Sequence, residues 1–558
     1  MEQNTVRLND CKRPRAVVLI CFVLMFAAGL LVSGDYGVPT DQWTELHILF
    51  DNTREYVSLF FNADSEIMYR FDESGIGYIS SSIERDHGQA GYYPLALILI
   101  LATHLFGNLA NWDISYIYHC YTFVLSFTAV IAVYILAKDI FGSRKTALLG
   151  AAMLFISPRF FAESHYNNKD IILLCLAIDM CCFGILSIKY RKPCHVILFS
   201  LFSALTCNTK IVGLFFFGVL GISYVIYVFV IYKWNVAEGV IKGEAGAWYK
   251  TNIVVMCSAI IMFLVFYYTL TPSMWRDPID FFDHSLFNAF NFSRWDGYAL
   301  FDGQLYRPAN HELPIRYLPQ LMLITSPVFV VILSAVGIGR FIAAAAGRDR
   351  GNWQKLFFTA VICIYSLLPM VVGSLTRAIV YNGWRHFYFS YFGLLFLAIY
   401  GLDWLTRRYG RLATICLNAA MGISLIITIA NHPYQNTFFN FMAGSDVEAK
   451  YETDYWGLSS MDALRLVLSD APEDGLAHVT WTNDTSRLLL INAYNTLPDE
   501  ESDRLWLEND ISKAEYIVSD NSSINKYGSI DIPNDFVQID SISAYGNELC
   551  AIFKRVKD

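Results

Sequence analysis

Long apolar runs recur along the first 430 residues of this 558-residue chain. A helix that crosses the hydrocarbon layer of a membrane needs about 20 consecutive apolar residues. Hydrophobic residues make up 55% of the chain and charged residues only 16%, which excludes an ordinary water-soluble protein of this length. The sequence therefore predicts a mainly α, multi-pass membrane protein with about 11 transmembrane helices. The expected spans are 16–34, 115–137, 146–158, 171–188, 194–208, 211–232, 251–270, 317–339, 355–374, 386–403 and 411–430.

The short connections between the spans predict which side of the membrane each one faces. Lys and Arg concentrate in alternate connections, and cytoplasmic connections carry this excess. The basic stretches are 7–15, 138–145, 189–192, 233–250, 340–355 and 407–411. The opposite connections are richer in acids, among them Asp35, Asp41, Glu45, Asp277 and Asp280. We therefore expect a cytoplasmic N-terminus and an extracytoplasmic C-terminal part.

Two long connections are expected on the outer face. Residues 35–114 form a first external loop that contains an apolar segment at 91–107, too short to cross and suited to the membrane interface. Residues 271–316, rich in Asp, Arg, Trp and Pro, form the second. Both should lie over the outer ends of the helices.

The composition becomes that of a soluble domain after residue 431. The stretch "SSMDALRLVLSD" (459–470) has the apolar spacing of an amphipathic helix. Strands are expected at 476–481, 514–520, 535–542 and 548–556. The chain is thus divided into a transmembrane domain, 1–431, and a small extracytoplasmic α/β domain, 432–558.

One short polar break stands out among the apolar runs. The stretch "SPRFFAESHYNNKD" (157–170) places Arg159, Glu163, His165, Lys169 and Asp170 between two spans, on the predicted outer face. The first external loop adds a second acidic stretch, "GDYGVPTDQW" (34–43), directly after the first span. Because both stretches begin where a helix ends on the same face, we expect them to converge on one site.

These features resemble the membrane glycosyltransferases of the C-type fold that use lipid-linked sugars. The shared features are an external Asp after the first span, a long first loop with a half-buried helix, the string "SPRFFAESHYNNKD" and the string "YETDYWGLS" (451–459). Within that class the chain is most similar to a bacterial branch of the protein O-mannosyltransferase and aminoarabinose transferase superfamily. The resemblance covers roughly the whole chain, is strongest over 30–215, and implies a bacterial plasma membrane.

The resemblance implies roles for two acids. Asp41 aligns with the catalytic acid of the first loop, which the family usually writes as an Asp-Glu pair. This chain has Gln42 as the second member, a departure that removes one carboxylate and puts in doubt any role that needs both, such as metal binding. Asp35 is the alternative candidate, and Asp170 matches the acid of the family's second external loop.

The resemblance also implies cations that would hold the donor phosphate. Arg385 in "NGWRHFYF" resembles an Arg that opens a late span, and Lys210 in "CNTKIVG" resembles a Lys at an external turn. Arg159 is a third candidate for the phosphate. The possible supporting residues are Asp35, Glu163, His165, Asn167 and Lys169.

The chemistry of an outer-face enzyme agrees with these roles. Nucleotide sugars are made in the cytosol, so a sugar used outside must cross on a lipid, and a polyprenyl-phosphate sugar meets that need. Its phosphate, with a second pKa of about 6, departs without strong acid assistance when Arg or Lys stabilises the charge. A carboxylate should take the proton of the acceptor hydroxyl as it attacks. We expect Asp41 to be that base and Asp170 to orient the acceptor, the sugar or the base. We also expect one sugar to be transferred, with inversion at its anomeric carbon.

Each candidate also has a structural interpretation. Asp41 and Asp170 fit the caps of the helices that follow them, and Arg385 fits a side chain that extends from a helix end to the lipid headgroups. No compact spacing of metal ligands is present, so no cofactor is expected and a divalent metal is not supported. A net charge of −9 argues against nucleic acid as a partner.

Two other classes of function stay open at this stage. A transporter or flippase of a lipid-linked substrate would place ionisable residues inside several spans, where Asp179 is the main example. A non-catalytic scaffold of the same fold is compatible with Gln42. Transfer of whole oligosaccharides to protein is disfavoured, because the tail is small and lacks a Trp-Trp-Asp signature. The sequence does not define which sugar is transferred. The acceptor is a protein hydroxyl, a lipid head group or a glycan. Membrane lipids surround the enzyme.

Overall fold

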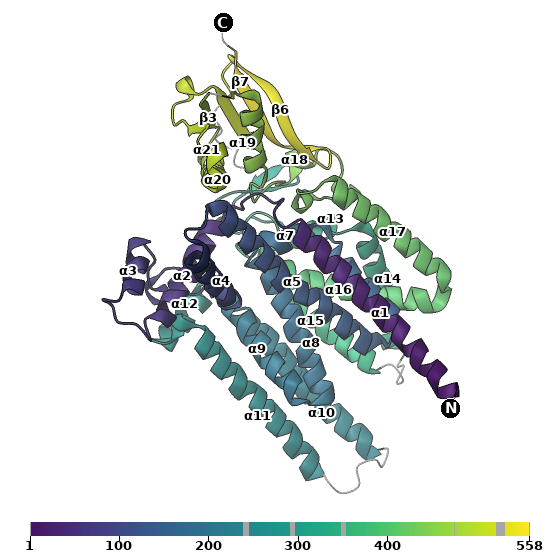
Figure 1. Cartoon of the computed structure of the whole chain (residues 1–558). Coiled ribbons are helices and arrows are strands. Elements are labelled where there is room, and N and C mark those ends of the chain that lie inside the picture. The colour runs from purple at the N-terminus through teal and green to yellow at the C-terminus, as the bar shows by residue number, and fades with distance from the viewer. Residues whose placement is uncertain are drawn as a thin grey trace.

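The structure is a computed structural model that describes residues 2–237, 245–290, 296–347, 353–473, 475–520 and 531–556. Figure 1 shows long helices lying side by side, with a sheet-containing unit above one end of the bundle. The helices of the first 430 residues are α1 (Glu2–Leu31), α2 (Gln42–Val57), α3 (Glu66–Glu73), α4 (Tyr93–Phe106), α5 (Asn111–Phe141), α6 (Arg144–Phe155), α7 (Pro158–Tyr166), α8 (Asp170–Tyr190), α9 (Pro193–Thr209), α10 (Gly213–Ala237), α11 (Ala245–Leu270), α12 (Pro278–Phe290), α13 (Tyr317–Ile324), α14 (Val328–Ala346), α15 (Trp353–Leu375), α16 (Tyr391–Tyr409) and α17 (Arg411–Ala430).

The helices confirm a multi-pass membrane protein, but not a count of eleven spans. In the described part of the chain, eight helices are long and apolar enough to cross a membrane, and a ninth span results if the pair α6 and α7, bent by 65°, crosses as one. Each expected span coincides with helix. The spans expected at 16–34, 146–158 and 194–208 correspond to shorter apolar helices or to one arm of the bent pair.

One expected span has wrong boundaries. The run 317–339 is divided into α13 and α14 by a break at 325–327, directly before Val328. Pro327 ends the first helix because proline lacks a backbone N–H and disfavours helical backbone in the residue before it. The corrected span is α14.

Helix ends at the basic face follow local sequence. Helix α5 ends at Phe141 and is followed by Gly142, which adopts left-handed backbone with φ of 72°, a conformation that suits glycine after a helix. Ser143 then caps α6, because its side chain accepts a hydrogen bond from the backbone N–H of Thr146 at 3.2 Å. The chain therefore turns sharply and returns toward the opposite end of the bundle.

Helix α8 lies at the centre of the bundle. Of its most apolar stretch, 94% is buried inside the protein, whereas the corresponding stretch of α11 is 11% buried. Asp170 is the first residue of α8 and lies at the end of the bundle that faces the sheet. The most deeply buried of the described candidate spans thus carries a candidate site residue.

Helices α14 and α16 pack closely through glycines. A Cβ atom on Gly337 would lie 1.9 Å from the Leu397 carbonyl oxygen, and one on Gly401 would lie 2.3 Å from the Leu333 oxygen. Small residues permit such close approach between membrane helices. This contact fixes α16, and with it the short helix η6 (Arg385–Ser390) that precedes it.

The two long connections pack against each other on one flank. Arg85 Nη2 lies 3.2 Å from Asp280 Oδ2, and His284 Nε2 lies 3.1 Å from the Ile83 oxygen. The first connection also contacts the end of α11, because the Tyr93 hydroxyl donates to the Leu270 oxygen at 2.9 Å. The expected apolar segment at 91–107 is α4, a 14-residue helix. The second connection also forms a hairpin of β1 (Ala299–Phe301) and β2 (Gln304–Tyr306).

The C-terminal part is a five-stranded mixed sheet with helices packed on it (Figure 1). The strand order is β4-β3-β5-β7-β6. Strand β3 is parallel to its neighbours β4 and β5, whereas β7 is antiparallel to its neighbours β5 and β6. The strands are β3 (Ala477–Trp481), β4 (Leu505–Leu507), β5 (Tyr516–Asp520), β6 (Phe536–Ala544) and β7 (Asn547–Arg555).

The predicted helix and the four predicted strands of this part are confirmed. The helix is α19 (Ser459–Asp470), and the sequence did not predict β4 or α20 (Asp484–Thr496). The segment after α17 contacts the membrane helices, since Asn440 Nδ2 donates to the Leu323 oxygen at 2.8 Å. The domain boundary at 431/432 stays a prediction.

Candidate functional site

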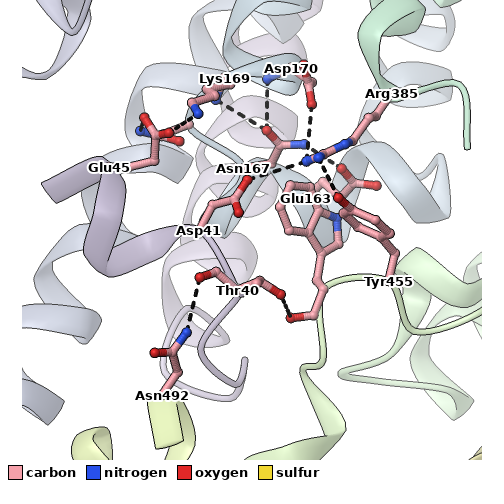
Figure 2. Close-up of polar contacts among 12 residues, drawn as sticks. Thr40, Asp41, Glu45, Glu163, Asn167, Lys169, Asp170, Arg385, Tyr455 and Asn492 are labelled. Atoms are coloured by element: carbon pink, nitrogen blue, oxygen red, sulfur yellow. Dashed lines mark hydrogen bonds and ion pairs between the residues drawn. The ribbon is translucent and has the colours of Figure 1, made fainter. Parts of the chain in front are cut away.

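Asp41 lies at the N-cap position of α2 but does not act as a cap. Its side chain makes no capping hydrogen bond. Instead, Asp41 Oδ2 lies 3.5 Å from Arg385 Nη1, and the Asp41 side chain is 37% exposed. The carboxylate thus faces a buried cation and is open to solvent at the same time (Figure 2).

The backbone next to Asp41 is held by the C-terminal part. The Thr40 N–H and the Thr40 hydroxyl both donate to the Trp456 oxygen at 3.1 Å, and Asn492 Nδ2 of α20 donates to the Thr40 oxygen at 3.1 Å (Figure 2). Gly37 lies equally close, because a Cβ atom there would meet the Leu458 oxygen at 2.3 Å. These contacts fix the strand of chain that presents Asp41.

Arg385 is buried among aromatic rings rather than extended to the lipid headgroups. Its guanidinium carbon lies 4.3 Å from the ring centre of Tyr381, 4.4 Å from Tyr455 and 4.8 Å from Trp456. Arg385 Nη2 donates to the Tyr455 hydroxyl at 2.5 Å. Burial raises the pKa of Tyr455, so this phenol stays neutral as the acceptor.

Asp170 is paired with two cations. Lys210 Nζ lies 2.5 Å from Asp170 Oδ1, and Arg385 Nη1 lies 3.8 Å from Asp170 Oδ2. Arg385 therefore bridges Asp41 and Asp170, which come from separate loops (Figure 2). The side chain of Asp170 is almost fully buried.

Asn167 caps α8 and leaves Asp170 available to the cations. Asn167 Oδ1 accepts from the backbone N–H of Lys169 at 3.2 Å and of Asp170 at 2.8 Å. Asn167 Nδ2 donates to Glu163 Oε2 at 2.6 Å. The cap role considered for Asp170 thus belongs to Asn167.

A second carboxylate lies beside Asp41, and the sequence interpretation missed it. Glu45 is buried and forms an ion pair with Lys169, and it accepts from Asn168 Nδ2 at 3.2 Å. Burial disfavours the charge of Lys169, but Glu45 and Asp41 outweigh it and raise the pKa of Lys169. The spacing of Asp41 and Glu45, four residues apart at the start of a helix, is the signal that could have found it.

Gln42 points away from this cluster. Gln42 Nε2 donates to Ser115 Oγ at 3.0 Å, and Gln42 Oε1 lies 2.9 Å from His119 Nε2. The residue is buried against α5. The departure at this position therefore changes a packing contact, while Glu45 keeps a second carboxylate near Asp41.

Arg159 and Glu163 line a pocket next to Arg385. Arg159 stacks on the Phe439 ring at 5.2 Å, and buried Glu163 accepts from the Tyr388 hydroxyl at 2.7 Å. The pocket is partly open to solvent. An adjoining pocket shares Arg159, Thr325, Trp384 and Tyr388 with it and is otherwise mostly apolar.

Two candidates lie outside the charged cluster. His165 stacks between Tyr36 at 4.6 Å and Phe123 at 4.8 Å, and its Nε2 lies 3.1 Å from the Gly29 oxygen, so it joins α7 to α1. Asp35 pairs with His432 Nε2 at 2.8 Å. Neither side chain contacts Arg385 in the described structure.

The cluster pairs three acids with three cations at one end of the bundle: Asp41, Glu45 and Asp170 with Lys169, Lys210 and Arg385. The two cations around Asp170, buried Arg385 and partly exposed Lys210, suit a phosphate, which guanidinium and ammonium groups bind. Among the described residues, no group of three or more His, Cys, Asp or Glu side chains has the arrangement of a metal site. The fold and site define a multi-pass membrane protein with a charged site at one end of its helix bundle.

The comparison with known families agrees with this class. Residues 99–276 match the family model for dolichyl-phosphate-mannose-protein mannosyltransferases. The matched segment contains Arg159, Asp170 and Lys210, whereas Asp41 and Arg385 lie outside it. The predicted resemblance to this glycosyltransferase superfamily is confirmed over the segment, and the match supports transferase activity.

Solved structures are similar over most of the chain. ArnT from Cupriavidus metallidurans bound to undecaprenyl phosphate has 13% identity and a TM-score of 0.46, covering 96% of this chain and 97% of its own. The arabinofuranosyltransferase AftD from Mycobacteria has 11% identity and a TM-score of 0.38, covering 96% of this chain and 41% of its own. No curated protein matches the chain. At these TM-scores neither structure assigns a role to a residue here.

Proposed function

We propose that this protein transfers a single sugar from a polyprenyl-phosphate donor to an acceptor hydroxyl, with inversion at the anomeric carbon. The observation that carries the proposal is Arg385, a buried guanidinium placed between exposed Asp41 and buried Asp170. The family match over 99–276 and the ArnT structure with bound undecaprenyl phosphate are consistent with such a donor. No cofactor is part of the proposal.

Arg385 and Lys210 hold the donor phosphate. When the phosphate binds, it replaces Asp41 as the partner of Arg385, and the 3.5 Å contact between them opens. Both cations then stabilise the charge that develops on the leaving phosphate. Asp170, held by the same two cations, keeps them oriented.

Asp41 takes the proton of the acceptor. As the acceptor oxygen bonds to C1 of the sugar, its proton passes to the Asp41 carboxylate. The bond from C1 to the phosphate oxygen breaks, and its electron pair leaves with the polyprenyl phosphate. One displacement on the face opposite the phosphate gives inversion, and an exposed carboxylate suits an acceptor that arrives from solvent.

The lipid part of the donor occupies the apolar side of the site. The adjoining pocket is lined by Phe160, Ile171, Leu174 and Pro327 between helices of the bundle. We place the site on the extracytoplasmic face of a bacterial plasma membrane, because the basic connections lie at the other ends of the same helices. The acceptor is a protein, a lipid or a glycan hydroxyl.

The test is release of polyprenyl phosphate by purified protein, supplied with a panel of polyprenyl-phosphate sugars and membrane extract as the acceptor source. Asp41→Asn removes the base but keeps the shape, so we expect turnover to fall at least about a hundredfold. Donor binding should persist. Asp35→Asn is the matched control, since Asp35 lies on the same face and pairs with His432.

Full turnover by Asp41→Asn would refute the assigned base, and loss in Asp35→Asn alone would move that role to Asp35. Failure of the wild-type protein to bind any donor would refute the transferase and favour transport. A transporter would use a buried acid inside the membrane, and Asp179 is the main candidate for that role. Its carboxylate accepts a hydrogen bond from Thr128 Oγ1 at 2.6 Å.

A further inference from the structure

We propose that this protein binds an anionic glycerophospholipid at the basic ends of its helices, with one acyl chain in a cavity between α8, α9, α10 and α11 and the phosphate on Arg191 and Lys192. Ser187, which lines the cavity, lies about 25 Å along α8 from Asp170, at 1.5 Å per residue. The site is therefore separate from the charged cluster. It takes a lipid of the surrounding membrane, and it stands independently of the proposed function.

An apolar cavity of about 310 Å³ lies between these four helices. Ligand sites in proteins have volumes of about 300–1,000 Å³. Ile222 and Ile260 of the lining are 64% and 40% exposed, so the cavity borders the outer surface of the bundle. An acyl chain can enter from that surface, whereas water would find few polar partners inside. Each helix contributes an apolar side chain to the lining, among them Ile188, Phe199, Leu220 and Met256.

Two glycines of α10 keep the cavity open. Gly218 and Gly221 line it, and a Cβ atom on either would have no heavy atom within 4 Å. Gly337 and Gly401 differ from them, because a Cβ atom at those positions would collide with the neighbouring helix. No helix contact requires glycine at 218 or 221, so the space beside them is available to a ligand.

The cavity is connected to a cation at its basic end. Tyr224 lines the cavity, and its hydroxyl donates to Asn252 Oδ1 at 3.0 Å. The same Asn252 oxygen accepts from Arg191 Nε at 2.7 Å. The Arg191 guanidinium also stacks on the Trp248 ring at 4.4 Å. These contacts hold Arg191 where the cavity ends.

The positive charge at this end has no acid to balance it. Arg191 is held by a neutral amide and an indole ring, and the Lys192 ammonium lies 6.0 Å from the Tyr190 ring centre. Lys189 differs from both, because it forms an ion pair with Asp139. Within the described ranges, no acidic side chain forms an ion pair with Arg191 or Lys192. A lipid phosphate supplies the missing counter-charge, since guanidinium groups bind phosphate through paired hydrogen bonds.

Two polar atoms beside this cation lack partners. Ser187 is 5% exposed, and its Oγ has no hydrogen-bond partner among the residues that the structure describes. Trp248 Nε1 is likewise buried without a partner there. Both groups donate hydrogen bonds, and the ester carbonyls and phosphate of a glycerophospholipid accept them. A polyprenyl chain carries no ester, so these atoms favour a glycerophospholipid.

The experiment measures binding of the first lipid to delipidated protein by native mass spectrometry. The probes are phosphatidylglycerol, which is anionic, and phosphatidylethanolamine, which is zwitterionic, with the same acyl chains. We expect the wild-type protein to bind phosphatidylglycerol at least about fivefold more tightly. Gly221→Leu places a side chain in the cavity and should weaken binding of both lipids about tenfold. Gly339→Leu is the matched control, because Gly339 of α14 also has open space around it but does not line the cavity.

Arg191→Gln tests the headgroup contact. It should weaken binding of phosphatidylglycerol about tenfold and leave binding of phosphatidylethanolamine within about twofold, so the preference disappears. Lys145→Gln is the matched control. Lys145 is an exposed cation of another basic connection, where it donates to Thr414 Oγ1 at 2.6 Å, and it does not line the cavity.

Equal affinity of the wild-type protein for the two lipids would overturn the anionic headgroup. Wild-type affinity in both Gly221→Leu and Gly218→Leu would overturn the cavity as the acyl site, as would an equal loss in Gly339→Leu. Displacement of phosphatidylglycerol by undecaprenyl phosphate, one for one, would assign the cavity to a polyprenyl chain and overturn the proposal. Thermal unfolding without added lipid shows whether each variant is folded, and Arg191→Gln still tests the site if the glycine variants are not.

Discussion

At the scale of single residues, Arg385 carries the largest share of the site's geometry. Its side chain is only 7% exposed and contacts Asp41, Asp170 and three aromatic rings. A guanidinium can bridge two carboxylates and stack on rings at once because it is planar and has five N–H donors. A lysine ammonium at the same place keeps the charge but loses both properties.

Arg385→Lys should therefore lower the rate of sugar transfer about a hundredfold or more, through weaker stabilisation of the departing phosphate. The measurement is kcat/KM for release of polyprenyl phosphate, with thermal unfolding to confirm the fold. Arg316→Lys is the control, since Arg316 pairs with Asp302 and stacks on Phe301 at an exposed position where such pairs contribute little. Activity of Arg385→Lys within about threefold of wild type would contradict the bridging role.

At the scale of elements, the site forms where three helices begin, and the C-terminal part of the chain holds one of them in place. Helix α8 begins at Asp170, η6 begins at Arg385, and α2 begins directly after Asp41. The first turn of a helix carries a partial positive charge that favours acids and phosphates. The C-terminal part then fixes Thr40 through Trp456 and through Asn492 of α20.

Asn492→Ala should reduce kcat about tenfold and leave KM for the donor within about twofold, because it loosens the chain that presents the base without touching the phosphate cations. A purely structural loss would lower thermal stability and would change both constants. The control is Asn495→Ala on the same helix, where only the backbone oxygen makes the contact to Asn111. If Asn492→Ala raised KM and spared kcat, α20 would instead be part of the donor site.

At the scale of the whole molecule, the sequence predicted what local patterns determine. Apolar run length located the helices, and alternation located the strands of the C-terminal part, because each property is set within a few residues. The break at Pro327 was missed although it too is local. Asp41, Asp170, Lys210 and Arg385 were found through the family resemblance, and the structure brings them together.

Other parts of the site depend on contacts that no local pattern records. Glu45 meets Lys169, which lies more than a hundred residues later, and Tyr455 and Trp456 cover Arg385 only because the chain after α17 returns over the bundle. His165 and Asp35 were expected near the acids from their sequence neighbours. Each instead points to a partner on another element, Gly29 and His432 respectively.

The last prediction concerns the direction of the whole protein in the membrane. Helix α8 has 21 residues, enough to cross a layer of about 30 Å, with Asp170 at one end and the exposed Cys194 just beyond the other. In intact cells, a membrane-impermeant maleimide should label Ser445→Cys, an exposed position on the side of the sheet, and should leave Cys194 unlabelled until the membrane is opened. The reverse pattern would place Asp41 and Arg385 in the cytoplasm. Nucleotide sugars would then reach the site directly, and the argument for a lipid-linked donor would lose its topological basis.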